Sequence, residues 1–173
     1  VFNTGHTAID NLDDFDLLSK NDLEETLNIH FQEKNILMTF HPVTHAKDLG
    51  LNTLSNVFRA LESFKDCGII ITRPNIDPGF GKLNEMIDTF VNTGNHRWVF
   101  TSLGTHKYFS LIAQSNLMLG NSSSGLMEAP HFKIPTIDIG DREEGRPRGN
   151  SVINCAEDVN SIENSIREAF NFK

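Results

Sequence analysis

The stretch LMLGNSSSGLMEA, residues 117–129, has the pattern of a β-strand, a tight turn and the start of a helix. Apolar residues lead to a glycine, three serines follow, and a second glycine precedes a run of helix-forming residues. The first N–H groups of a helix lack backbone partners and together carry roughly half a positive charge, so they attract anions. The stretch therefore predicts a phosphate-binding turn with added hydroxyl donors from Ser122, Ser123 and Ser124.

Glu128 stands four residues after Ser124, which places both residues on one face of the predicted helix. A carboxylate repels phosphate but can accept two hydrogen bonds from a diol such as a ribose. The pair therefore favours a nucleotide over bare phosphate. The pattern is neither a Walker loop nor the G-x-G-x-x-G fingerprint, and by itself it is also compatible with serines that only cap a helix and an acid that only faces solvent.

On both sides of this stretch, short apolar runs alternate with amphipathic segments. Strands are expected at residues 36–40, 68–72, 98–101, 117–120, 136–139 and 151–154. Helices are expected at about 52–65, 81–92, 107–114 and 159–170, and a short one after the serines. This alternation predicts parallel β-α-β units, and hence a doubly wound, Rossmann-like α/β fold of about six strands with helices on both faces.

Ligands of open parallel sheets bind beyond the carboxyl ends of the strands. The residues that follow the predicted strands are the polar and glycine-rich parts of the chain: His41 and the ranges 73–77, 102–105, 120–124 and 140–146. Because these segments meet at one edge of the sheet, the sequence predicts a single site of nucleotide size.

Two side chains after the first strands could contact a ligand. His41 precedes a proline that forces an extended exit, and its imidazole could donate to a phosphate or transfer a proton. Asn75, in a loop rich in turn formers, could bond a ligand. Taken alone, either residue is more often explained by local hydrogen bonds to the backbone, and Pro42 argues against a metal site made by His41 with His45.

Residues 140–150, GDREEGRPRGN, place three arginines and three glycines after a strand. Flexible backbone with guanidinium groups, such as those of Arg142 and Arg146, suits a diphosphate that arrives and leaves. A solvated charged loop is the alternative.

The composition excludes several other classes. The formal net charge is −8 and no basic stripe is present, which argues against nucleic acid as a partner. No apolar run approaches the ~20 residues of a membrane span, so a cytoplasmic protein without membrane contact is expected. Cys67 and Cys155 are far apart and are interpreted as buried thiols. We expect no metal and no cofactor.

Residues 1–35 differ from the rest, with crowded acids and one capped short helix at about residues 19–27. Their apolar periodicity is too weak for a domain. We interpret 1–35 as an entry segment from a missing N-terminal domain, and 36–173 as a Rossmann-like nucleotide-binding domain.

Five ordered motifs resemble one enzyme family. They are His-Pro-Val-Thr at 41–44, Pro-Asn-Ile-Asp at 74–77, Gly-Asn-Ser-Ser-Ser-Gly at 120–125 with Glu128, Pro-Thr-Ile-Asp-Ile-Gly at 135–140, and Arg142 through Gly145-Arg146. Together they resemble the hydrolysing UDP-N-acetylglucosamine 2-epimerases of sialic-acid and related nonulosonate biosynthesis. The non-hydrolysing sister enzymes look similar but carry an Asp-Ser-Gly-Gly type of turn where this chain has residues 121–125.

The resemblance implies a GT-B arrangement of two Rossmann-like domains, with UDP held by the C-terminal one. Matched to the family's motifs, His41 lies near the diphosphate and counts as catalytic, and the other UDP-binding residues are Asn75, Ser102, Leu103, Ser122, Ser123, Glu128 and Arg142. Ser124 and Arg146 are further candidates. Glu128 would bind the ribose, and the backbone at Ser102 and Leu103 would meet the uracil.

The family's reaction removes the proton at C2 of the sugar, eliminates UDP and adds water to give N-acetylmannosamine. Its carboxylates come largely from the N-terminal domain, so we expect this chain alone to bind UDP weakly, if at all, and not to turn over substrate. Family members are commonly homodimers or homotetramers. The alternatives are a non-hydrolysing epimerase, another GT-B glycosyltransferase half, and a non-catalytic nucleotide-binding module.

Overall fold

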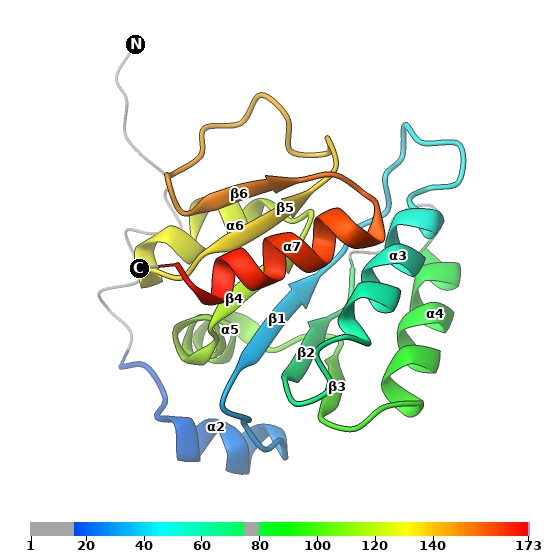
Figure 1. Cartoon of the computed structure of the whole chain (residues 1–173). Coiled ribbons are helices and arrows are strands. Elements are labelled where there is room, and N and C mark those ends of the chain that lie inside the picture. Colours follow the sequence, from blue (N-terminus) through cyan, green and yellow to red (C-terminus); the bar gives the residue numbers. More distant parts are fainter. Residues whose placement is uncertain (1–15, 75–79, 173) are drawn as a thin grey trace.

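A computed structural model describes residues 16–74 and 80–172 and shows one six-stranded sheet (Figure 1). All strand pairs are parallel, and the order across the sheet is β3-β2-β1-β4-β5-β6. The strands are β1 (Asn35–Thr39), β2 (Gly68–Thr72), β3 (Arg97–Phe100), β4 (Leu117–Gly120), β5 (Thr136–Ile139) and β6 (Val152–Cys155). This is the predicted doubly wound α/β fold, and each predicted strand lies within one residue of its observed bounds.

Helices cover both faces of the sheet. One face carries α3 (Leu51–Leu61), α4 (Phe80–Asn92) and α7 (Val159–Phe170), and the other carries α2 (Lys20–Leu27) and α5 (Gly104–Gln114). The short α6 (Ser123–Met127) and the 3₁₀ turn η2 (Ala129–Phe132) connect β4 to β5. The helix predicted to reach residue 65 ends at Leu61, because i→i−3 bonds from Ser63 and Phe64 tighten its last turn.

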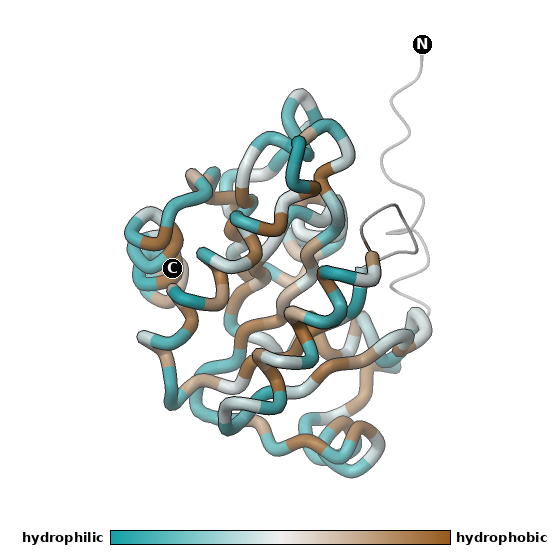
Figure 2. Tube along the Cα trace, turned by 90° about the vertical axis from the view of Figure 1, so that its right-hand side faces the viewer, coloured by the Kyte–Doolittle hydropathy of each residue, from teal (hydrophilic) through white to brown (hydrophobic). Residues whose placement is uncertain are grey.

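Alternating side chains of the central strands build two cores. Ile36 and Met38 of β1 point to the α3–α4–α7 face, whereas Leu37 between them points to the α2–α5 face. All three are fully buried, so each contributes about 1.5–3 kcal/mol of apolar burial. Figure 2 accordingly shows hydrophobic segments mainly in the interior of the molecule and hydrophilic segments mainly toward its outside.

The described part of the predicted lead-in segment packs on the domain. Ser19 and Asp22 form the expected capping box at the start of α2. Leu23 and Ile29 are fully buried in the core that α2 shares with α5. Residues 16–35 therefore complete one face of the sheet, while the domain boundary at residue 35 stays a prediction.

The strand order places the reversal point of the fold between β1 and β4, which are neighbours in the sheet but far apart in sequence. Ligand crevices of doubly wound folds lie at this point, beyond the carboxyl ends of the strands. Among residues 16–74 and 80–172, no helix is both long enough and apolar enough to cross a membrane.

Candidate functional site

Gly120, the last residue of β4, sets the path of the chain into the site. Its φ is +144°, a conformation that residues with a side chain rarely adopt. A Cβ atom there would overlap the carbonyl oxygen of Thr39 on β1. Glycine therefore lets the two strand ends approach closely at the reversal point.

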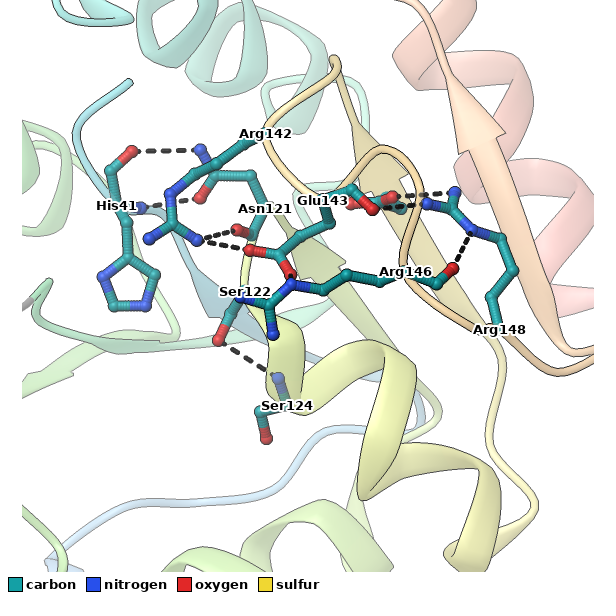
Figure 3. A network of polar contacts seen from close by, with 9 residues as sticks. His41, Asn121, Ser122, Ser124, Arg142, Glu143, Arg146 and Arg148 are labelled. Carbon is teal, nitrogen blue, oxygen red and sulfur yellow. Dashed lines mark hydrogen bonds and ion pairs between the residues drawn. The ribbon is translucent and has the colours of Figure 1, made fainter. Parts of the chain in front are cut away.

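Asn121 joins the ends of β1 and β4 by a reciprocal pair of hydrogen bonds. Its Oδ1 accepts from the backbone N–H of His41 at 2.7 Å, and its Nδ2 donates to the carbonyl of His41 at 3.0 Å. Asn121 is fully buried and His41 is 8% exposed. Figure 3 shows Asn121 bonded to both His41 and Arg142. The side-chain amide of Asn121 thus bonds to the backbone of His41 as a neighbouring strand would, and this fixes the position of the histidine.

Asp138 of β5 and four residues of the loop that follows form what we call the arginine cluster: Asp138, Arg142, Glu143, Arg146 and Arg148. Arg142 donates through Nη1 to Glu143 Oε1 at 2.6 Å and to the backbone oxygen of Asn121 at 3.0 Å. Arg146 Nε lies 2.8 Å from Glu143 Oε2. The cluster thus contacts the strand-joining asparagine directly (Figure 3).

Arg148 connects the loop to strands β5 and β6 of the sheet. It donates through Nη2 to the carbonyl of Glu143 at 2.7 Å and through Nη1 to Asp138 Oδ2 at 3.1 Å, and it also contacts Asn154. Burial raises the pKa of Asp138 above its ordinary value, with Glu143 adding to the rise and Arg148 opposing it. The sequence predicted flexible backbone here, but buried ion pairs hold this loop.

Helix α6 begins at the serines, as predicted, but it is only five residues long. Ser122 is its N-cap, and its Oγ accepts from the backbone N–H of Ser124 at 3.4 Å. Ser123 is the first helical residue. Glu128 ends the helix one turn beyond Ser124, whose carbonyl accepts from the Glu128 N–H at 2.9 Å. Pro130, in the 3₁₀ turn that follows, cannot continue the α-helical ladder.

A second part of the site, the Glu128 pocket, has a volume of about 400 Å³. It is lined by Thr72, Ser102, Leu103, Gly104, Thr105, Tyr108, Phe109, Ser124 and Glu128. Oε2 of Glu128 is buried and has no hydrogen-bond partner in the described parts of the chain. The Tyr108 hydroxyl donates to Ser124 Oγ at 2.7 Å, and burial raises its pKa. The pocket therefore combines apolar side chains, such as those of Leu103 and Phe109, with a buried acceptor, Glu128 Oε2, that has no hydrogen-bond partner in the described chain.

Comparison with known proteins identifies the family. The sequence pattern described as UDP-N-acetylglucosamine 2-epimerase matches residues 1–173. This chain belongs to the UDP-N-acetylglucosamine 2-epimerase family. The membership predicted from the five motifs is thereby confirmed.

Two relatives in the epimerase family show what share of their own length this chain matches. The GDP/UDP-N,N'-diacetylbacillosamine 2-epimerase (hydrolyzing) of Campylobacter jejuni is 32% identical over 97% of this chain and 44% of its own length. The UDP-N-acetylglucosamine 2-epimerase of Neisseria meningitidis is 29% identical over 88% and 40%. The chain thus spans less than half the length of these relatives.

A solved epimerase has the same fold. The Methanocaldococcus jannaschii UDP-GlcNAc 2-epimerase, in complex with UDP-GlcNAc and UDP, superimposes with a TM-score of 0.70 over 99% of this chain and 48% of its own. Its sequence identity is 20%, so it supports the fold.

The structure divides the predicted epimerase residues between the two parts of one edge. His41, Ser122, Arg142 and Arg146 gather around Asn121 (Figure 3), while Ser102, Leu103, Ser124 and Glu128 line the Glu128 pocket. Ser122 and Ser124 lie two residues apart at the start of α6 and connect the two parts. Asn75 lies outside the described residues, and the ligand roles of all these residues stay predictions.

Sequence reasoning missed four residues that organise the site: Asn121, Glu143, Asp138 and Tyr108. An asparagine directly after a strand glycine, and an acid between arginines, were the available signals. His45 makes an exposed ion pair with Asp141 at 3.1 Å, and the described residues contain no cluster of three or more metal-ligating side chains. A larger hollow of about 510 Å³ between α3 and α4 contains none of the predicted residues.

Proposed function

We propose that this chain is the C-terminal, UDP-binding half of a hydrolysing UDP-N-acetylglucosamine-type 2-epimerase that serves sialic or related nonulosonic acid biosynthesis. Family membership supports the epimerase assignment, and the hydrolysing name of the Campylobacter jejuni relative supports the subclass. The turn at residues 121–125, with serines in place of glycines, supports it as well. A separate N-terminal domain would supply the rest of the enzyme.

UDP would extend along the edge of the sheet, from the arginine cluster to the Glu128 pocket. The diphosphate would lie near His41, Ser122, Ser123 and Arg142. These residues surround the start of α6, where backbone N–H groups lack helical partners. The site combines guanidinium donors, hydroxyl groups and backbone amides, which is the donor set that phosphate oxygens accept from.

The nucleoside would occupy the Glu128 pocket. Its volume of about 400 Å³ is in the range of small-molecule sites. The uracil would meet the backbone at Ser102 and Leu103, and the ribose diol would donate to Glu128. The buried Oε2 of Glu128 carries this proposal, because an unpaired carboxylate oxygen costs free energy until a donor reaches it.

In the proposed reaction, the proton at C2 of the sugar is removed, UDP departs in an anti elimination to leave a glycal, and water adds to give the free 2-epimeric sugar. This chain would act on the leaving group. Arginine and amide donors that are already in place stabilise the charge that develops on the departing diphosphate. Carboxylates of the N-terminal domain would handle the C2 proton, with His41 close to the leaving oxygen.

Binding of UDP tests the proposal through Glu128→Ala. The wild-type chain should bind UDP with millimolar affinity and more tightly than ADP, as measured by NMR titration. Removing the acceptor for the ribose should weaken UDP binding about tenfold or more, the scale of one charge-assisted hydrogen bond. Glu168→Ala on the exposed face of α7 is the matched control and should bind like wild type. An unchanged affinity for UDP in Glu128→Ala removes the ribose role, and equal binding of ADP argues against a uridine site.

A further inference from the structure

Glu143 is the most deeply buried acid of the arginine cluster. Its side chain is 1% exposed, yet it contacts Arg142 through Oε1 and Arg146 through Oε2. Its backbone carbonyl accepts from Arg148. Burying a carboxylate is costly, and pairing offsets that cost only when the geometry is good. A solvated loop has no need of such an arrangement, so the acid has a role beyond charge balance.

The carboxylate holds two guanidinium groups while leaving many of their donors unused. Arg142 uses only Nη1, and Arg146 only Nε, in hydrogen bonds or ion pairs with the described residues. An arginine has five N–H donors in a fixed fork, so the remaining N–H groups of both side chains can reach a ligand. Their side chains are 29% and 52% exposed, so solvent and solutes have access to them.

The ion pairs of the cluster join three arginines to two acids, Asp138 and Glu143. The same loop also carries the exposed acids Asp141 and Glu144, so it has no overall positive surplus. What matters is position: Arg142 and Arg146 lie near Ser122, at the start of α6 (Figure 3). Without Glu143, two neighbouring guanidinium groups would repel each other and sample separate rotamers.

We propose that Glu143 is a positioning residue: it holds Arg142 and Arg146 together as a paired donor for a diphosphate and thereby favours a nucleoside diphosphate over a monophosphate. This inference rests on the proposed UDP site and adds the residue that organises it. Two phosphoryl groups engage two guanidinium groups at once, whereas a monophosphate gains less from the second one.

A positioning role for Glu143 and a simple charge effect predict opposite changes in UDP affinity when this residue is replaced. Replacing Glu143 with glutamine removes a negative charge, and attraction through space would then make anion binding tighter. Positioning predicts the reverse, because the fixed spacing of the two arginines is lost. The direction of the change in affinity therefore separates the two explanations.

The test compares UDP and UMP binding to wild type, Glu143→Gln and the exposed neighbour control Glu144→Gln, by NMR titration at physiological ionic strength. We expect Glu143→Gln to weaken UDP binding about tenfold and UMP binding less than about threefold. The Nε resonance of Arg146, which lies beside the carboxylate in the wild type, should shift in this variant. Glu144→Gln should match wild type in all three readouts.

Equal or tighter UDP binding by Glu143→Gln overturns the positioning role, and so does an equal loss for UDP and UMP. Glu143→Asp retains the charge on a shorter side chain and serves if the glutamine variant is not folded. It should also weaken UDP binding, and wild-type affinity in this variant overturns the inference. The sequence alone leaves room for a chain that binds no UDP, but the proposed function requires detectable binding, so a wild-type chain that binds no UDP overturns the proposed function and this inference with it. UDP binding unaffected by Glu143 substitution overturns only the inference.

Discussion

In the arginine cluster a buried carboxylate, that of Glu143, contacts two guanidinium groups, whereas in the Glu128 pocket a buried carboxylate oxygen contacts no donor in the described chain. Without a ligand, Glu143 already has a cation beside each oxygen, although its Oε2 has only the ion pair with Arg146 and no hydrogen bond in the described chain. The Glu128 oxygen lacks a partner. The difference separates two uses of buried polar groups, since internal pairing fixes a shape before binding and an unpaired acceptor gains a partner on binding.

This comparison predicts where substitutions act. Changes in the arginine cluster and its anchor Asn121 should lower the free energy of unfolding, because internal hydrogen bonds are lost. Changes at Glu128 should weaken UDP binding and leave the free energy of unfolding nearly unchanged. The three substitutions that follow challenge this division, from the largest expected effect to the smallest.

Gly120→Ala should remove both parts of the site together. The added Cβ would overlap the Thr39 carbonyl and impose φ +144° on a residue with a side chain. We expect the free energy of unfolding to fall by about 4 kcal/mol, measured by urea denaturation. Gly81→Ala is the matched control, since a Cβ there meets no atom within 4 Å and the residue lies in α4, where alanine stabilises a helix by about 0.5–1 kcal/mol. Similar stability of the two variants would mean that β1 and β4 do not approach as described.

Asn121→Ala should damage the arginine cluster and spare the Glu128 pocket. The buried N–H and carbonyl of His41 lose their partners, so we expect a loss of about 2–3 kcal/mol in unfolding free energy. The half-buried Asn56 donates to the Glu157 carbonyl in a solvent-exposed hydrogen bond and provides the control Asn56→Ala, with an expected loss below about 0.5 kcal/mol. NMR signals from the Glu128 pocket should keep their wild-type positions, and their wholesale displacement would show that the two parts are not separable.

Much of the fold follows from local patterns in the sequence. Strands such as the one with Ile36, Leu37 and Met38 are buried on both faces, so their apolar runs are continuous. The alternation of such strands with amphipathic helices along the chain implies parallel order. His41, Ser122 and Arg142 could be placed at one edge because every parallel strand ends there. The strand order itself, which makes β1 and β4 neighbours, depends on pairings distant in sequence and was not predicted.

The internal organisation of the site was less predictable. Asn121 bonds to a residue 80 positions earlier in the chain, and no local spacing encodes that pairing. Glu143 looked like one acid in a solvated loop because the sequence does not show burial. Residues that contact a ligand can be inferred from chemistry and strand ends, whereas residues that position them depend on tertiary contacts.

Asp138→Asn tests whether every unpaired buried oxygen marks a ligand. Asp138 Oδ1 also lacks a hydrogen-bond partner in the described chain, yet Asp138 lines neither part of the site's open surface and its Oδ2 is paired with Arg148. We therefore expect its substitution to change stability and to leave UDP binding within about twofold. An asparagine retains an acceptor for Arg148, so the variant should fold.

The pH dependence of stability gives the direction in which Asp138→Asn should change the free energy of unfolding. Burial raises the pKa of Asp138 above 3.8, so the folded state holds this proton more tightly than the unfolded state does. The resulting stability is fully present below pH 3.8 and is lost as the pH rises through the higher folded pKa, with a slope of at most about 1.4 kcal/mol per pH unit. Asparagine does not titrate, so Asp138→Asn does not lose this stability. Its free energy of unfolding should therefore rise relative to that of the wild type as pH rises from about 3.8. Asp158→Asn should behave in the opposite sense: hydrogen bonds from Ser161 lower the pKa of Asp158, so the wild type has extra stability above pH 3.8 that this variant lacks, and the difference should vanish as pH falls through the folded pKa. A pH-independent difference for Asp138→Asn, together with weakened UDP binding, would instead place Asp138 with Glu128 as an acceptor for the ligand.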